Sequence, residues 1–384
     1  MSLPFDPRFE VAFDVDPGSV PATGDWTDLS DRLRRVSTVF GQSGTIAGLS
    51  NVDLDNEDRH LDPTNDASPY NLVPMRHARL SVDIGGTTRQ LWRGFVDQWP
   101  PVWPGYNRAH VAAALVDATA WFALQDVDLD LPEQRTDERI EALLDAANWP
   151  AAARDIQTGI ITVEPHEQVS ANVFRTLTDT ADSEDGVLYI DADGNVVFRN
   201  RHHRFDMDPD AVAATAGDGL AVVEVAPEYG ADDLTNVARV ELADGRVYEF
   251  VDTSSRDAYG PRVRAIRDLT VRPVEAEALG QWEVYRYAQP NLSLAQITFR
   301  HPDVDELDAI VQRRIGDLIE FTHQPPGGGD PMTMVGHIER IHHTIDDGPW
   351  ETAWDLSPYF GQGPWLTLDD DVLGLLDDDN MLAP

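Results

Sequence analysis

The sequence predicts an α+β protein that is mostly β, with two small β-barrel domains flanking a mixed α/β middle domain. Apolar and polar residues alternate in short segments over the first 120 residues and again in the last third, which is typical of half-buried strands. Helical periodicity is confined largely to the middle, and segments near the two ends follow a similar pattern. These observations predict domains at 1–120, 121–270 and 271–360, followed by an acidic tail at 361–384.

The composition excludes several classes of protein. The 384 residues carry 29 basic and 68 acidic side chains, a net charge of −39. A direct nucleic-acid binder would need clustered Lys and Arg to neutralise phosphates. No apolar run reaches the length of about 18 residues expected of a transmembrane helix. The chain has no cysteine, which excludes disulfides, thiolate nucleophiles and Cys-ligated zinc.

The basic residues are all arginine, and this skew bears on the source of the protein. A high-salt proteome favours an acidic, Lys-poor surface, whereas a GC-rich genome replaces Lys by Arg through codon usage. A halophilic archaeal source and a high-GC bacterial source therefore both stay open. In either case the charge concerns solubility and not the fold.

The first domain is predicted to consist of strands joined by turns rich in Gly and Pro. The paired glycines Gly85-Gly86 separate two alternating segments and predict a hairpin. Residues 26–36 predict a short helix or a turn. The expected strands are 9–15, 51–56, 76–84, 89–96 and 109–117.

The middle domain is predicted to hold two helices and a hairpin. Thr136 is a good N-cap, and Ile140, Leu143 and Leu144 follow at helical spacing, which predicts an amphipathic helix at about 137–148. A second helix is expected at 169–181. Residues 187–199 should form a hairpin that turns at Asp193-Gly194. Further strands are expected at 220–228, 236–242 and 246–251.

In the last third, residues 304–314 predict a helix or a loop, followed by strands at 318–322, 332–345 and 350–356. Residues 314–359 follow the same pattern as residues 76–120. Each has a strand, a Gly-rich turn, a strand containing Gly94 or Gly336 before apolar and acidic residues, and a last strand. We predict two copies of one small β-barrel. The alternative is a chance similarity, because alternating strands resemble one another.

No motif specifies a catalytic, cofactor-binding or metal-binding residue, and we expect no cofactor and no enzymatic activity. Gly41-Gln42-Ser43-Gly44 lacks the strand–turn–helix context of a nucleophile elbow. Gly327-Gly328-Gly329 lacks the Lys-Ser/Thr of a phosphate-binding loop. Asp191-Ala192-Asp193-Gly194-Asn195 resembles part of a calcium loop, but a hairpin turn explains it better.

Two further possibilities stay open at this stage. His202-His203 and His342-His343 are adjacent pairs, and adjacent residues on a strand point to opposite faces, so one of each pair could join His323 or His337 in a metal site. The ten tryptophans could line a carbohydrate groove, although packing uses are commoner.

One string is more specific than the rest. Residues 52–70 read VDLDNEDRHLDPTNDASPY, followed by Leu72-Val73-Pro74, Gly94-Phe95-Val96-Asp97 and Trp103-Pro104-Gly105. This string resembles the N-terminal region of the minor tail proteins, or baseplate-hub (tail-associated) proteins, of long-tailed siphovirus-type viruses. Leu61 stands where that family has Phe. Weaker similarity continues through Arg139-Ile140, Asn148-Trp149-Pro150, 185–199, Thr235-Asn236-Val237, Tyr259-Gly260, Ile315-Gly316-Asp317 and Gly348-Pro349-Trp350.

The resemblance implies two hub-type barrels and a structural virion protein at the tail tip, forming a homotrimeric ring that adapts a sixfold tail tube and helps in DNA ejection. The implied partners are a second and third copy of the chain, a distal tail protein or tail-tube ring, a tape measure protein, and other tail-tip or fibre proteins. The alternative function is a tail-tip receptor or carbohydrate binder.

The residues of this string also have a local physical meaning. Asp62-Pro63, Asn65 and Ser68-Pro69 form turns and should fix one rigid long loop. Four arginines nearby should pair with acids of the same chain or across a subunit interface: Arg59, Arg76, Arg79 and Arg93. The alternative is that these are ordinary surface ion pairs.

Overall fold

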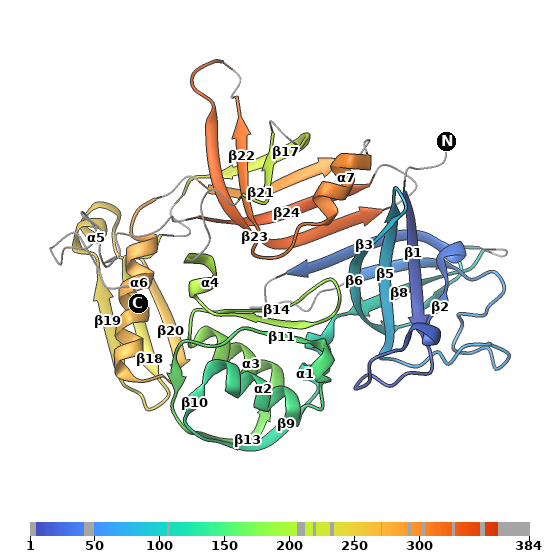
Figure 1. Ribbon diagram of the computed structural model, residues 1–384, viewed down its shortest axis with the longest axis horizontal. Coiled ribbons are helices and arrows are strands. Elements are labelled where there is room, and N and C mark those ends of the chain that lie inside the picture. The colour runs from blue at the N-terminus through green and yellow to red at the C-terminus, as the bar shows by residue number, and fades with distance from the viewer. Residues whose placement is uncertain are drawn as a thin grey trace.

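The computed structural model describes residues 5–41, 50–105, 108–205, 212–217, 220–230, 234–269, 271–290, 293–300, 304–324, 327–345 and 350–359. The expected acidic tail at 361–384 lies outside these residues. No helix in the described ranges is long and apolar enough to cross a membrane. One large sheet dominates the molecule, with two smaller bodies beside it (Figure 1).

The amino-terminal part of the sheet comes from residues 5–116. Its strands are β1 (Phe5–Ala12), β2 (Thr27–Asp28), β3 (Leu33–Gly41), β4 (Ser50–Asp55), β5 (Arg76–Ile84), β6 (Thr87–Gln98), β7 (Pro101–Val102) and β8 (His110–Val116). The predicted hairpin is β5–β6, and Gly85 and Gly86 take the positive φ values that its turn needs. Residues 26–36, predicted as a helix or turn, contain a 3₁₀ turn (Ser30–Arg32) and the start of β3.

The carboxy-terminal part of the sheet lies edge to edge with the first. It consists of β16 (Ala214–Ala216), β17 (Val222–Glu228), β21 (Ser293–Arg300), β22 (Leu318–His323), β23 (Met332–Ile345) and β24 (Glu351–Pro358), with helix α7 (Val304–Val311) between β21 and β22. The mostly-β prediction is confirmed. The described strands do not close into two separate barrels, because β3 pairs with β23 and joins both parts in one sheet.

The first smaller body packs helices against a hairpin. It holds α1 (Ala118–Ala123), β9 (Asp126–Leu131), β10 (Gln134–Arg135), α2 (Thr136–Ala146), β11 (Arg154–Ile156), β12 (Thr162–Val163), β13 (His166–Asn172), α3 (Val173–Asp182), β14 (Val187–Ile190), β15 (Val196–Arg199) and α4 (His202–Phe205). The predicted helix at 137–148 is α2, and the predicted hairpin is β14–β15. The helix predicted at 169–181 begins four residues later, because Asn172 is its N-cap and accepts a hydrogen bond from the backbone N–H of Arg175.

The second smaller body is inserted between β17 and β21. It consists of β18 (Val237–Leu242), β19 (Val247–Val251), α5 (Thr253–Tyr259), β20 (Val263–Leu269) and α6 (Pro273–Tyr287). Helix α6 packs on this three-stranded sheet, with Ala276 and Leu279 buried against Val240 and Leu242. In Figure 1 this body and the α2–α3 body lie to one side of the large sheet.

Candidate functional site

The two parts of the large sheet share one topology. We call β3, β4, β5, β6 and β8 the N-terminal module, and β17, β21, β22, β23 and β24 the C-terminal module. In the N-terminal module the strands lie in the order β5-β6-β8-β4-β3. In the C-terminal module they lie in the order β22-β23-β24-β21-β17. Numbered along the chain, the order is 3-4-5-2-1 in both. All four pairings are antiparallel in both modules. The similarity between residues 76–120 and 314–359 therefore has a structural counterpart.

Two irregularities of the strand pairing match as well, whereas the register shifts at Leu80/Ser81 and at Ala226/Pro227 have no counterpart in the other module. A bulge follows Val96 in the pairing of β6 with β8, and a bulge follows Ile338 in the pairing of β23 with β24. These residues stand two positions after Gly94 and Gly336. A second bulge separates Leu33 from Arg35 on β3 and Val222 from Glu224 on β17. Bulges are built-in features of a sheet, so their coincidence indicates two copies of one structural unit.

The two glycines serve the same purpose in the two modules. A Cβ atom on Gly94 would lie 2.3 Å from the carbonyl oxygen of Val116, and one on Gly336 would lie 2.7 Å from the carbonyl oxygen of Ser357. Each glycine lets the neighbouring strand approach closely where the bulge begins. This gives a physical reason for the glycine that begins both Gly94-Phe95-Val96-Asp97 and Gly336-His337-Ile338-Glu339.

The modules meet at a hydrogen-bonded junction. Strand β23 is long, and its two halves have different neighbours on one side. Its first half pairs with β22, whereas residues 340–345 pair with β3, with Val36 opposite Ile345 and Ser37 opposite Thr344. The first strand of one module thus lies against the fourth strand of the other.

Each module also has an edge that corresponds to this junction but lies free in the described structure. Strand β17 is the counterpart of β3, and it pairs only with β21. The segment 98–103, which includes β7, is the counterpart of residues 340–345 and pairs only with β8. Large apolar side chains on and beside these edges are exposed: Val102 by 37%, Trp103 by 58%, Val223 by 53% and Tyr229 by 71%.

The long loop after β4 is held by its own polar side chains. Asp62 is fully buried; it accepts hydrogen bonds from Arg59 Nη2 at 2.8 Å and from the Thr64 hydroxyl at 2.6 Å. Ser68 donates its hydroxyl hydrogen to the carbonyl oxygen of His60 at 2.6 Å. The Tyr70 ring stacks on Phe13 at 4.6 Å. The turn residues of the loop thus make the local side-chain hydrogen bonds expected from the sequence.

Three of the four arginines singled out in the sequence pair within the chain. Arg59 contacts Asp62, Arg76 lies 3.4 Å from Asp16, and Arg79 lies 2.7 Å from Glu10. The guanidinium of Arg93 lies over the Trp26 ring, 5.5 Å from its centroid. Burial lowers the pKa of Arg93.

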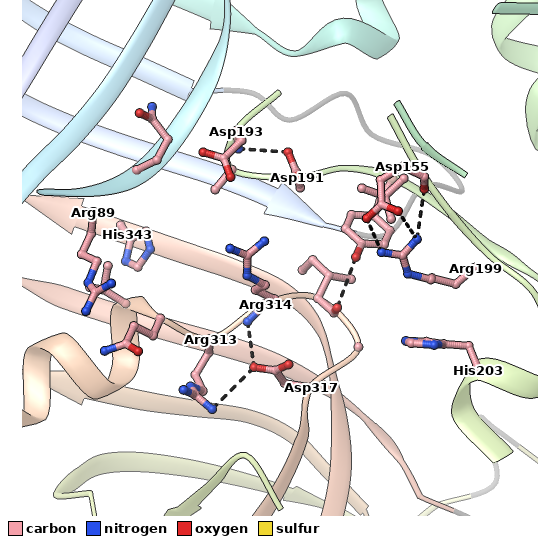
Figure 2. Close-up of a pocket in the computed structure, with 18 of the residues that line it drawn as sticks. Arg89, Asp155, Asp191, Asp193, Arg199, His203, Arg313, Arg314, Asp317 and His343 are labelled. Carbon is pink, nitrogen blue, oxygen red and sulfur yellow. Dashed lines mark hydrogen bonds and ion pairs between the residues drawn. The ribbon is translucent and has the colours of Figure 1, made fainter. Parts of the chain in front are cut away.

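A cleft of about 540 Å³ lies where the two modules meet the β14–β15 hairpin (Figure 2). Arg89 comes from β6, Asp191 and Asp193 from the hairpin turn, and Arg314 and Asp317 from the segment before β22. Its lining includes both arginines and aspartates.

Contacts within this cleft are structural. The Tyr189 hydroxyl donates to the carbonyl oxygen of Ile315 at 3.4 Å, and burial raises the pKa of Tyr189 to about 12. Arg199 donates to Asp155 and lowers the pKa of that carboxyl. Burial raises the pKa of Asp317, whose carboxylate accepts from the Arg314 backbone N–H.

The segment that resembles a calcium loop forms the hairpin turn predicted as the better explanation. Asp191 Oδ1 accepts hydrogen bonds from the backbone N–H groups of Asp193 at 2.9 Å and Asn195 at 2.8 Å. Its other oxygen accepts from the Asn195 amide at 3.0 Å. The carboxylate therefore holds the turn.

Three of the histidines considered as metal ligands contact residues of the sheet, whereas His202 and His203 lie on helix α4 and not on a strand as expected. His337 lies 3.2 Å from the carbonyl oxygen of Gly316, His342 lies 3.4 Å from Asp355, and His343 lies 2.9 Å from the Thr352 hydroxyl. Over the described part of the chain, no three His, Asp or Glu side chains are grouped as metal ligands would be.

The tryptophans do not gather into a groove among the described residues. Most are buried in the cores: Trp92, Trp99, Trp149, Trp282, Trp350 and Trp354. Trp103 is instead exposed, on one of the free edges. Sequence reasoning missed this edge and its counterpart, although Phe40-Gly41 at the end of β3 and Tyr229-Gly230 directly after β17 are a matching signal.

Comparison with known proteins adds independent evidence on the fold. No protein-family model matches the chain, and no curated protein matches it. A tail protein from Neisseria meningitidis MC58 aligns with a TM-score of 0.63 at 10% identity, covering 93% of this chain and 98% of that one. The 43 kDa tail protein of prophage MuSo2 from Shewanella oneidensis aligns with a TM-score of 0.58 at 15% identity, covering 92% and 96%.

A third similar structure is an E. coli component of the type VI secretion system, described as similar to the T4 tail proteins gp27 and gp5. It aligns with a TM-score of 0.55 at 11% identity and covers 86% of this chain and 74% of that one. The chain therefore has the fold of tail-associated phage proteins. The resemblance predicted from the sequence is confirmed for the fold.

Proposed function

We propose that this chain, with a fold shared by phage tail proteins, is a structural protein of a virion tail that forms a trimeric hub at the tail tip. The observation that carries the proposal is the duplicated module, with its two matched bulges and its edge-to-edge junction. Three chains with two modules each present six similar units. Such a ring fits the sixfold symmetry of a tail tube on one side and the threefold symmetry of a tip on the other.

In this proposal the two smaller bodies reach away from the ring. The α2–α3 body and the inserted β18–α6 body both lie to one side of the large sheet (Figure 1), and among the described strands β17 pairs only with β21 and β7 only with β8. These bodies would face further tail-tip or fibre proteins. The sheet would face a distal tail protein or the last ring of the tube, whose lumen leads the tape measure protein and then the DNA outward during ejection.

The test is the mass of the purified protein in molar salt and in dilute buffer. We expect three times 42.6 kDa in molar salt. Dilute buffer should favour dissociation, because unscreened repulsion between chains of net charge −39 opposes assembly. A monomer at every salt and protein concentration would contradict the proposal. Binding of that monomer to host cells would favour the receptor-binding alternative.

A further inference from the structure

The two free edges are complementary halves of a junction that the chain already makes once. Inside one chain, the first strand of the N-terminal module (β3) pairs with residues 340–345 of the C-terminal module. The first strand of the C-terminal module (β17) and residues 98–103 of the N-terminal module are the corresponding halves. In the described structure neither of them meets a partner strand on that side.

The matched strand pairings determine which residues of the N-terminal module correspond to which residues of the C-terminal module. The bulge that separates Val96 from Gln98 matches the one between Ile338 and Arg340, so Gln98 corresponds to Arg340. Counting on from there, Val102 corresponds to Thr344. The pairing of Val102 with His110, at the start of β8, supports this count because Thr344 pairs with Glu351 at the start of β24.

The same count applies to the other edge. Val222 corresponds to Leu33, since each stands directly before its bulge. Ala226 therefore corresponds to Ser37, and Tyr229-Gly230 corresponds to Phe40-Gly41. Within the chain, Ser37 lies opposite Thr344 and Phe40 lies opposite Ile341. Between two chains, Ala226 would lie opposite Val102, and Tyr229 opposite Trp99.

We propose that β17 of one copy of this chain docks antiparallel against residues 98–103 of the next copy, repeating the β3–β23 junction between chains. The proposal rests on the proposed function, since a ring of three needs one head-to-tail contact per chain. It accounts for the apolar side chains of Val102, Trp103, Val223 and Tyr229, which lie exposed on or beside these two edges.

Proline shapes this contact. Pro100, Pro101 and Pro227 have no N–H group, so the two edges form an incomplete hydrogen-bond ladder. Side-chain packing around Trp103 and Tyr229 must supply most of the contact. Proline also keeps these edges from pairing indiscriminately with other strands, as expected of edges reserved for one partner.

The absence of cysteine gives a direct test, because introduced thiols have no competitors. We expect the variant with Val102→Cys and Ala226→Cys to form disulfides between chains on mild oxidation in molar salt. Opposed residues of antiparallel strands have Cα atoms about 4.5 to 5.5 Å apart, within the range a disulfide spans. Denaturing gels without reductant should show one, two and three linked chains, with three as the largest species.

The controls separate this proposal from the proposed function. Each single variant should stay unlinked, as should Val102→Cys combined with Val247→Cys, since Val247 is exposed on β19 away from both edges. A trimeric mass without cross-links in the Val102/Ala226 variant would overturn the docking proposal and leave the trimer standing. Linked species longer than three chains would overturn the closed ring. A monomeric mass of the unmodified protein would contradict the proposed function itself.

A second variant tests the same contact without a disulfide. Trp103→Glu places a charge on the N-terminal edge, and the residue is exposed, so the fold should be retained. We expect trimer formation in molar salt to need at least about 10-fold more protein, as measured by light scattering. Val247→Glu is the matched control. An unchanged trimer in Trp103→Glu would count against the proposed contact.

Discussion

The N-terminal and C-terminal modules share five strands and two bulges, but they differ in what covers them. Helix α7, which belongs to the C-terminal half of the chain, covers the core of the N-terminal module with Leu307 and Val311, and Trp350 enters the same core. The core of the C-terminal module is covered by Val187, Tyr189 and Val197 of the β14–β15 hairpin. Each module is thus covered by a segment that lies outside its own five strands.

The connections differ in the same way. Between β3 and β4 the chain has only residues 42–49, whereas between β17 and β21 it inserts the whole β18–α6 body. The strand before each module also differs, because β1 pairs antiparallel with β5 and β16 pairs parallel with β22. The two modules therefore share their strands, their two matched bulges and the glycine at one of them. They differ in their loops and in the segments that cover them.

The largest effect should come from Trp350, which tests whether the segment before the last C-terminal strand is part of the core of the N-terminal module. Its side chain is fully buried in the N-terminal core, although it precedes the last strand of the C-terminal module. We expect Trp350→Ala to lower the free energy of unfolding by about 4 kcal/mol, since truncation leaves a large cavity. Chemical denaturation in molar salt measures this.

The exposed Val247 provides the control, and Val247→Ala should change stability by less than about 0.5 kcal/mol. Equal effects of the two substitutions would show that Trp350 is not a core residue. Two separate unfolding transitions in the unsubstituted protein would show that the modules fold independently, and would break the comparison drawn above.

The matched glycines provide the next test. A Cβ on Gly94 would lie 2.3 Å from the Val116 carbonyl oxygen and 2.6 Å from the Trp92 ring, whereas one on Gly336 meets only the Ser357 carbonyl oxygen at less than 3.0 Å. We expect Gly94→Ala to cost about 3 kcal/mol and Gly336→Ala about 2 kcal/mol, because strands must move apart. Thermal and chemical denaturation would rank them, and a neutral result at either position would break the equivalence of the two glycines.

A third difference lies in one cross-strand pair. His77 lies opposite Phe95 in the N-terminal module, and the corresponding pair is Leu318 opposite His337 in the C-terminal module. Burial lowers the pKa of His77 to about 4, and its ring contacts the carbonyl oxygen of Asp16 at 3.1 Å. In the unfolded chain His77 binds a proton with a pKa near 6.5. The contribution of neutral His77 to the free energy of unfolding is therefore present above that pH and is lost as the pH falls toward 4.

We expect this group to remove about 2 kcal/mol of stability between pH 6.5 and pH 4. His77→Leu, which introduces the residue type of the corresponding Leu318, should remove this loss of unfolding free energy between pH 6.5 and pH 4. The measurement is the free energy of unfolding at several pH values in molar salt, compared with the unsubstituted chain. A substituted protein that keeps the same slope would assign the acid sensitivity to other groups.

Much of the strand pattern could be predicted, because alternation and turn residues act locally. The segment 76–84 is strand β5 with the predicted ends, and the turn at Gly85-Gly86 follows. Helix α6 was not predicted, because Trp282, Glu283 and Val284 are consecutive and all buried, which removes the amphipathic pattern. The free edges could not be predicted either. They depend on the long-range pairing of β3 with β23, and no local pattern encodes that register.

The smallest effect should come from the ion pair that ties the covering helix to the N-terminal module. Arg89 Nε and Nη2 donate to the two carboxylate oxygens of Asp308 on α7, at 2.7 and 3.0 Å. Both side chains are about one-third exposed, so solvent screening limits their interaction. A double-mutant cycle with Arg89→Gln and Asp308→Asn should give a coupling of about 0.5 to 1 kcal/mol in dilute buffer, and less in molar salt. A coupling of several kcal/mol would instead make this pair, and not Leu307 and Val311, the main link between helix and module. No coupling at either salt concentration would show that apolar contact alone holds α7 in place.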